Sequence, residues 1–221
     1  MNFKSQLLAI VLIIISVSSV RAQYAIGIFG GVNNSNLIGD APPGSTYESD
    51  PGLAVGILGE INITSDVKIS LQPMFQRKGA TIAYSVISER EPQDSIDINI
   101  NYFSIPILMK VYGVNNLLYV SGGFDIGYKL DASFKRIGSG TEKDISDSFN
   151  DFDIAAIFGV GAQFNIGLFY IFIEGRYSQG LGNISNPKAG EPEELNPSFR
   201  TTSLMLFAGL TYTFGGKAVD D

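Results

Sequence analysis

Glu174 and Arg176 are the side chains of this sequence best suited to chemistry. They stand two residues apart in a segment with an extended pattern, so a carboxylate and a guanidinium point to the same side of the chain. The sequence has no histidine, the group that most often serves in acid–base catalysis, and no cysteine. We therefore predict that the protein is not an enzyme and that this pair is structural. A histidine-free hydrolase that uses Glu174 is the alternative.

Asp144, Asp147, Asp151 and Asp153 form the other group with a possible chemical role. Their carboxylates could supply oxygen ligands to Ca²⁺, but their spacing lacks the fixed pattern of a calcium-binding loop. The simpler interpretation is a solvated acidic surface. We expect no metal site and no cofactor.

The segment around Glu174 alternates between apolar and polar residues. Phe169, Ile171, Ile173 and Tyr177 fall on one side, and the charged pair falls on the other. The pattern recurs about eight times and predicts strands at 24–34, 52–63, 67–80, 99–112, 117–130, 152–165, 168–180 and 199–214. An even number of alternating strands is typical of an eight-stranded antiparallel up-and-down transmembrane β-barrel, an all-β fold.

The predicted links between these strands are short and long by turns. Three are tight, at 64–66, 113–116 and 166–167, and four are long and polar, at 35–51, 81–98, 131–151 and 181–198. All long loops then lie at one end of the barrel and both termini at the other. In an outer membrane we expect the termini in the periplasm and the long loops outside the cell.

Residues 1–22 have the three parts of a signal peptide: Lys4, the apolar run from Leu7 to Ile15, and small residues up to Ala22. The predicted organisation is a cleaved leader at 1–22, a barrel at 23–214 and a short periplasmic tail at 215–221. The mature chain keeps 13 basic and 22 acidic residues, a net charge of −9. Nucleic acid is therefore an unexpected partner, and the predicted location is the outer membrane of a Gram-negative bacterium.

The predicted inner face carries charges of both signs in nearly equal number. The assigned residues are Glu60, Lys68, Lys78, Lys110, Asp125, Lys129, Asp153, Glu174 and Arg176. Because an unpaired charge in a narrow interior costs several kcal/mol, we expect these groups to pair with one another and the lumen to conduct little. A soluble lipocalin-like barrel, with its apolar face inside and these charges in water, is the alternative.

The predicted long loops are strongly acidic, with 15 acidic and five basic residues. Such a surface would repel lipopolysaccharide or bridge to it through divalent ions, so membrane lipid and lipopolysaccharide are the expected partners. Candidate contacts with protein partners are Glu89, Arg90, Glu91, Lys135 and Arg136.

Several segments carry a resemblance to a known family. They are GIFGGVNN at 27–34, LQPMFQRKG at 71–79, YFSIPILMK at 102–110, residues 162–165 and IEGRYSQGL at 173–181. With them the chain resembles the PorT-like outer-membrane β-barrel family of the Bacteroidetes, which shares an eight-stranded shape with the OmpA and OmpX barrels. The tail at 215–221 departs from the pattern, since such barrels commonly end at the last aromatic residue.

The resemblance implies a non-enzymatic barrel that stabilises the outer membrane or serves as a docking subunit of an envelope complex, such as a secretion apparatus. Other envelope or secretion proteins would then be its partners. The alternative function is a narrow channel or small-solute carrier across the outer membrane.

Overall fold

The computed structural model describes residues 24–39, 41, 44–84, 95–113, 115–136, 142–186 and 198–214. The predicted signal peptide at 1–22 and the tail at 215–221 lie outside these residues. In the described part of the chain, no helix has the length and apolar character needed to cross a membrane.

Eleven strands and one short 3-10 helix make up the described structure. They are β1 (Tyr24–Gly39), β2 (Ser45–Asn62), β3 (Val67–Leu71), β4 (Met74–Tyr84), β5 (Ile96–Ser104), β6 (Ile107–Gly113), β7 (Leu118–Arg136), β8 (Glu142–Asp144), η2 (Ser146–Ser148), β9 (Phe152–Ile166), β10 (Phe169–Gly180) and β11 (Phe199–Phe214).

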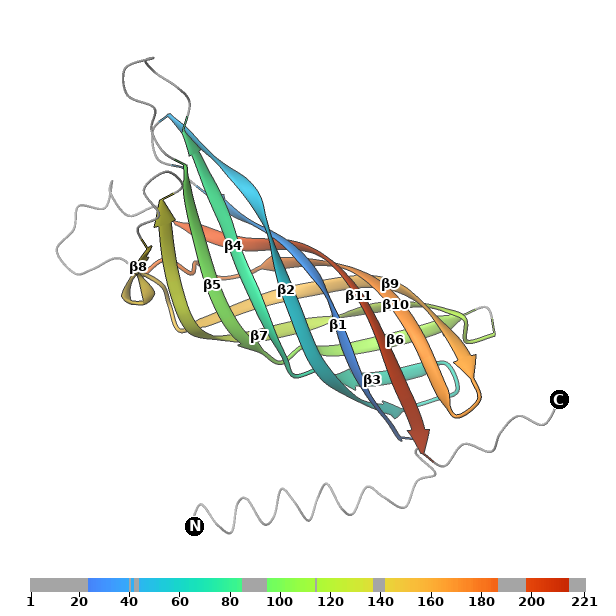
Figure 1. The fold of residues 1–221 in the computed structure, drawn as a ribbon. Coiled ribbons are helices and arrows are strands. Elements are labelled where there is room, and N and C mark those ends of the chain that lie inside the picture. The colour runs from blue at the N-terminus through green and yellow to red at the C-terminus, as the bar shows by residue number, and fades with distance from the viewer. Residues whose placement is uncertain are drawn as a thin grey trace, which may run out of the picture.

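The strands close into a barrel in which neighbours pair antiparallel (Figure 1). Around the ring, β1 pairs with β2 on one side and with β11 on the other, so the first and last strands seal the sheet. β3 with β4, and β5 with β6, each act as one wall strand, while β8 lies outside the ring as a partner of β7. The predicted eight-stranded antiparallel barrel is thus confirmed.

Two wall strands are interrupted where the sequence predicted continuous ones. The predicted strand 67–80 breaks at Gln72 and Pro73, and the predicted strand 99–112 breaks at Ile105 and Pro106. Proline has no backbone N–H to donate to a neighbouring strand, so it ends regular pairing. The two breaks lie side by side, since the Gln72 N–H donates to the Pro106 carbonyl at 3.0 Å.

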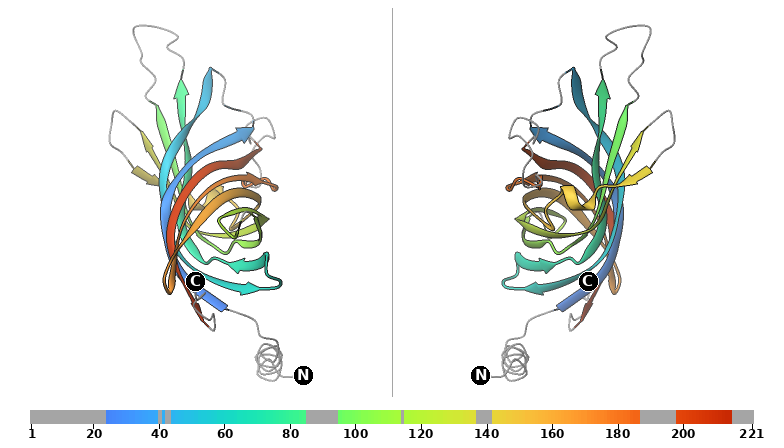
Figure 2. Two further views of the ribbon diagram at one scale, coloured as in Figure 1. Left: turned by 90° about the vertical axis from the view of Figure 1, so that its right-hand side faces the viewer. Right: turned by 90° about the vertical axis from the view of Figure 1, so that its left-hand side faces the viewer.

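Several strands run further than the sequence predicted. β1 continues to Gly39, β2 begins at Ser45 and β7 continues to Arg136, so much of the predicted loops 35–51 and 131–151 is strand. The upper parts of β2, β4, β5 and β7, together with β8, form what we call the sheet extension. β2, β4 and β5 rise past the other strands at one end of the barrel (Figure 2). One side of this extension is apolar, because Tyr47, Ile82 and Ile98 pack in one cluster.

A row of aromatic residues crosses the outer wall near this end. Pairing places the following outward-facing residues side by side on five successive strands: Val55, Phe75, Phe103, Tyr128 and Phe152. Because barrel strands are tilted, this row runs obliquely, with Phe152 nearest the upper end of the barrel. Ring centroids lie 5.2 Å apart for Phe75 and Phe103 and 5.4 Å apart for Tyr128 and Phe152. Aromatic residues near the end of a barrel wall, such as Tyr128 and Phe152, are typical of the membrane–water interface. We call the whole oblique row the upper aromatic row.

A second aromatic group lies at the opposite end, where Tyr24 pairs with Phe214 and Phe169 pairs with Tyr212. Between the two groups the exposed side chains of the wall are mostly Ile, Leu, Val and Phe. On β9 this belt runs from Phe152 to Phe164, roughly 40 Å along the strand and about 30 Å in height at a usual barrel tilt. That height matches the hydrocarbon thickness of a bilayer.

Glycines on the inner face make room for large side chains from neighbouring strands. A Cβ atom at Gly161 would lie 2.4 Å from Cζ of Tyr119, which pairs with it across β7 and β9. A Cβ atom at Gly159 would lie 2.5 Å from Oγ of Ser121 and 2.9 Å from Oε1 of Glu174. Each of these two glycines therefore leaves space that particular side chains of the neighbouring strands occupy.

Gly161→Ala is expected to destabilise the barrel by about 1–3 kcal/mol, because the added methyl group displaces a packed tyrosine ring. Urea unfolding in detergent micelles, followed by far-UV circular dichroism, measures the change. Gly175→Ala is the matched control on β10, since its Cβ atom would meet nothing within 4 Å. Equal midpoints for the two variants would contradict this account of the interior.

Candidate functional site

All nine predicted lumenal charges lie on the inner face of the barrel. Eight are buried, and the side chain of Lys68 is 14% exposed. They fall into a lower cluster (Glu60, Lys68, Lys110, Glu174 and Arg176), an upper cluster (Lys78, Asp125 and Asp153) and Lys129. Glu60 pairs with Ala25, next to the first described residue, so the lower cluster begins near the end where the described chain starts.

Glu174 is the centre of the lower cluster. Arg176 donates from Nε to Oε1 and from Nη2 to Oε2, both at 2.9 Å. Tyr119 donates its hydroxyl to Oε2 at 2.9 Å, and Ser121 donates to Oε1 at 2.7 Å. Lys110 Nζ lies 3.7 Å from Oε2. Both carboxylate oxygens thus already accept several hydrogen bonds, an arrangement that suits a structural anchor better than a general base.

The remaining members extend this network across the barrel. Lys110 donates to Oε1 of Glu60 at 2.7 Å, and Lys68 Nζ lies 3.7 Å from Oε2 of Glu60. Arg176 also donates from Nη2 to Oε1 of Gln72 at 2.6 Å, which joins residues 104 positions apart in the sequence. Aromatic rings lie beside the cations, with the Arg176 guanidinium 4.7 Å from the Phe207 centroid. The lower cluster therefore links opposite walls.

The upper cluster joins one lysine to two carboxylates. Lys78 Nζ lies 2.9 Å from Oδ2 of Asp153 and 3.7 Å from Oδ2 of Asp125. Gln76 donates to Asp125 at 3.0 Å, and Thr201 donates to Asp153 at 2.8 Å. This cluster has one acidic group in excess and the lower cluster has one basic group in excess, so the two sets balance each other.

Lys129 holds a chain segment across the upper end of the lumen. Its Nζ donates to the backbone carbonyls of Ser146 at 2.5 Å and Phe149 at 2.6 Å, and it lies 3.3 Å from Oδ1 of Asp151. The same segment is braced by Asp144, whose pKa is lowered by hydrogen bonds from the hydroxyl and backbone N–H of Ser146. The segment around η2 is therefore fixed from both sides.

Phe149 and Ile184 from the two connecting segments complete an apolar cap. Phe149 forms a bridge with Ser185, and the Ile184 N–H donates to the Phe199 carbonyl at 3.0 Å. Both side chains are buried in a cluster whose other buried members are Leu37, Ala80, Ile82, Ile98, Ile100, Tyr102, Ala132 and Phe199. Sequence reasoning missed this cap. Phe149 and Ile184 are large apolar residues within polar stretches, and that contrast was the available signal.

The four aspartates considered as possible calcium ligands are dispersed in the structure. Asp153 lies in the upper cluster, Asp151 pairs with Lys129 and Asp144 binds Ser146, so the four aspartates do not form one group. Within the described ranges, no three acidic residues are gathered as metal ligands.

The predicted partner contacts lie partly on the sheet extension. Lys135 and Arg136 are exposed at the end of β7. They are in a strand and not in a loop as predicted, because β5 and β8 pair with this part of β7. Glu89, Arg90 and Glu91 lie outside the described residues.

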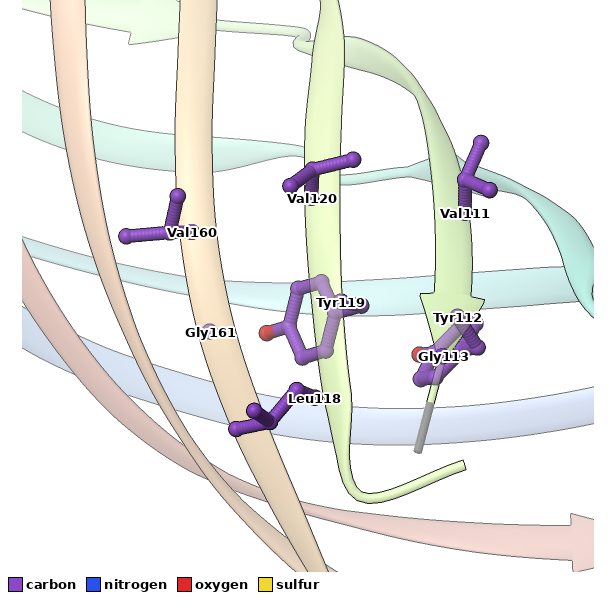
Figure 3. Close-up of a pocket in the computed structure, with 8 residues that line it drawn as sticks. All are labelled: Val111, Tyr112, Gly113, Leu118, Tyr119, Val120, Val160 and Gly161. Atoms are coloured by element: carbon purple, nitrogen blue, oxygen red, sulfur yellow. The ribbon is translucent and has the colours of Figure 1, made fainter. Parts of the chain in front are cut away.

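Two hollows lie in the described part of the outer wall. The lower hollow, of about 570 Å³, is lined by apolar side chains, glycines and two tyrosines of β6, β7 and β9 (Figure 3). The upper hollow, of about 580 Å³, is lined by apolar residues together with Gln76, Arg77, Asn101, Tyr102 and Asp131. Both lie in the wall and reach side chains that contact the lumenal clusters: Tyr119 of the lower hollow donates to Glu174, and Gln76 of the upper hollow donates to Asp125.

A closed antiparallel barrel with an apolar outer belt, aromatic rows at both edges and a polar interior defines an outer-membrane β-barrel protein. The chain belongs to the family described as outer membrane protein beta-barrel domain, whose profile matches residues 18–186. Membership of this family implies that the protein resides in the outer membrane.

Solved structures of bacterial surface barrels are similar in fold. Neisserial surface protein A is 12% identical, with 87% of this chain and 99% of that one covered and a TM-score of 0.45. Ail of Yersinia pestis is 16% identical, with coverages of 86% and 99% and a TM-score of 0.41. OprG of Pseudomonas aeruginosa is 14% identical, with coverages of 88% and 96% and a TM-score of 0.39. No curated protein matches the sequence.

Glu174→Gln is expected to lower the free energy of unfolding by about 3 kcal/mol, because it leaves Arg176 and Lys110 buried without their shared counter-charge. Thermal unfolding in micelles, monitored by circular dichroism and by the shift in gel mobility on boiling, measures this loss. Glu142→Gln in β8 is the matched control, since Glu142 is exposed. A wild-type midpoint for Glu174→Gln would show that the network does not support the fold.

Proposed function

We propose that this protein is a non-enzymatic outer-membrane barrel whose lumen is closed and whose outer surfaces make its functional contacts. The observation that carries the proposal is the filling of the interior. The two charge clusters, apart from the partly exposed Lys68, and the apolar cap are buried, so within the described residues solvent reaches few of the side chains that would line a pore. A channel needs an accessible lining of charged or polar groups, and a channel is disfavoured here because the charges of both clusters pair with one another inside the barrel.

The sheet extension supplies the surface for docking. Its outward side carries a row of polar residues, which pairing places side by side on neighbouring strands: Glu48, Thr81, Asp97, Lys135 and Glu142. Its other side contributes to the apolar cap. An extended sheet with one covered face and one polar face presents a rigid, charged platform to a partner.

In the membrane we propose that the tight turns and both chain ends face the periplasm, with the sheet extension outside the cell. The resemblance to PorT-like barrels supports a docking subunit of an envelope complex, with a secretion apparatus as the leading candidate. Lipopolysaccharide surrounding the extension is then the expected lipid neighbour. Glu174 is proposed to have no catalytic role, since its oxygens accept four hydrogen bonds.

The full protein, purified from outer membranes, is expected to give no stable unitary currents in planar lipid bilayers, because the buried clusters and the apolar cap fill the interior of the described barrel. A general porin measured in the same bilayers verifies that insertion is detectable. Reproducible single-channel steps would support the alternative, a narrow channel or small-solute carrier.

Affinity purification in mild detergent is expected to recover a large envelope partner with the barrel. The variant Lys135→Glu should reduce this recovery about fivefold, because a reversed charge on the platform opposes a complementary partner. Arg200→Glu is the control, since Arg200 is also an exposed cation but lies on β11. Recovery of the barrel alone from wild-type membranes would contradict the docking role.

A further inference from the structure

The upper hollow lies at the upper edge of the apolar belt on the outer wall. Its lower lining consists of Leu53, Val55, Phe75 and Leu130. The outward-facing residues change here from apolar to polar, from Phe75 to Arg77 on β4 and from Leu130 to Asp131 on β7, so this part of the hollow lies at the upper limit of the apolar belt. Any occupant must therefore be apolar at this end.

The upper lining of the hollow is polar and of mixed character. Pairing places Arg77, Asn101 and Asp131 side by side, immediately above the aromatic row. Arg77 donates from Nη2 to the Pro51 carbonyl at 2.5 Å and lies 3.5 Å from Oδ2 of Asp50. Asn101 donates to Oδ1 of Asp131 at 2.8 Å. This end presents hydrogen-bond donors and acceptors together.

The charges around the hollow select between headgroups. Arg77 is one cation, while Asp50 and Asp131 are two anions. A bare phosphate would meet both carboxylates, whereas sugar hydroxyls can donate to carboxylates and accept from guanidinium and amide groups at the same time. The lining therefore suits an uncharged sugar better than a simple anion.

Two irregularities in strand pairing flank the hollow. The register of β2 against β4 shifts between Ser49 and Ala54, and the register of β5 against β7 shifts between Asn101 and Tyr102. Bulges of this kind bend strands and redirect side chains, and they are common beside binding sites. Beside them, Nε of Arg77 is buried without a hydrogen-bond partner among the described residues.

We propose that the upper hollow binds a glycolipid of the outer leaflet, with an acyl chain on Leu53, Val55, Phe75 and Leu130 and the sugar on Arg77, Asn101 and Asp131. The inference rests on the proposed orientation, in which the sheet extension stands outside the cell. Binding to the purified protein does not depend on a docking partner. Failure of the lipid site and failure of the docking role are therefore measured separately.

Native mass spectrometry of the full protein in a detergent without sugar or phosphate, such as an amine oxide, tests the site. The probes are monoglucosyl diacylglycerol, phosphatidylglycerol and phosphatidylethanolamine with the same acyl chains. We expect one glucosyl lipid to be retained about tenfold more tightly than either phospholipid. Arg77→Ala and Asp131→Ala should each weaken its retention about fivefold, and Asn101→Trp should abolish it by filling the hollow.

Lys135→Gln is the control, because this exposed cation lies on the same face of the sheet but outside the hollow. Every variant is first required to show the gel-mobility shift of a folded barrel. Equal retention of all three lipids, or unchanged retention in Asn101→Trp, overturns the proposal. A preference for phosphatidylglycerol overturns the sugar assignment in favour of an anion site.

Discussion

The structure depends on one constraint: charges enclosed in a narrow barrel must find their partners inside it. Arg176 and Glu174 pair with each other within β10. Lys110 of β6, together with Tyr119 and Ser121 of β7, contacts the same carboxylate. The network continues to Glu60 in β2 and to Gln72 between β3 and β4. The interior thereby ties together strands that are distant around the ring, which the backbone pairing alone does not do.

Much of this architecture could be predicted from the sequence because a period of two assigns each residue of a strand to a face. The inward position of Lys78, Asp125 and Glu174 follows from that parity. Their partners could not be predicted, because the register between strands decides which charges meet. The breaks at Pro73 and Pro106 could have been predicted from the missing N–H groups, whereas the strand ends around Ser45 and Arg136 lie in polar segments that resemble loops.

The two ends of the barrel differ in how the strands end and are connected. At the lower end β9 and β10 are joined by a tight turn, with Gly167 at a φ of 67°. At the upper end the strands continue beyond the apolar belt, and Phe149 and Ile184 fill the space between them. The described interior thus holds paired charges and packed apolar side chains that stabilise the barrel. The exposed polar residues lie on the outer wall and on the sheet extension.

The way in which Lys129 holds the η2 segment bears on how this surface can evolve. Its ammonium group binds backbone carbonyls of Ser146 and Phe149, and a carbonyl is the same whatever side chain its residue carries. Asp147 and Ser148 between them are exposed. Substitutions at these two positions leave the clamp intact, so the exposed residues of this segment can change while the barrel stays closed.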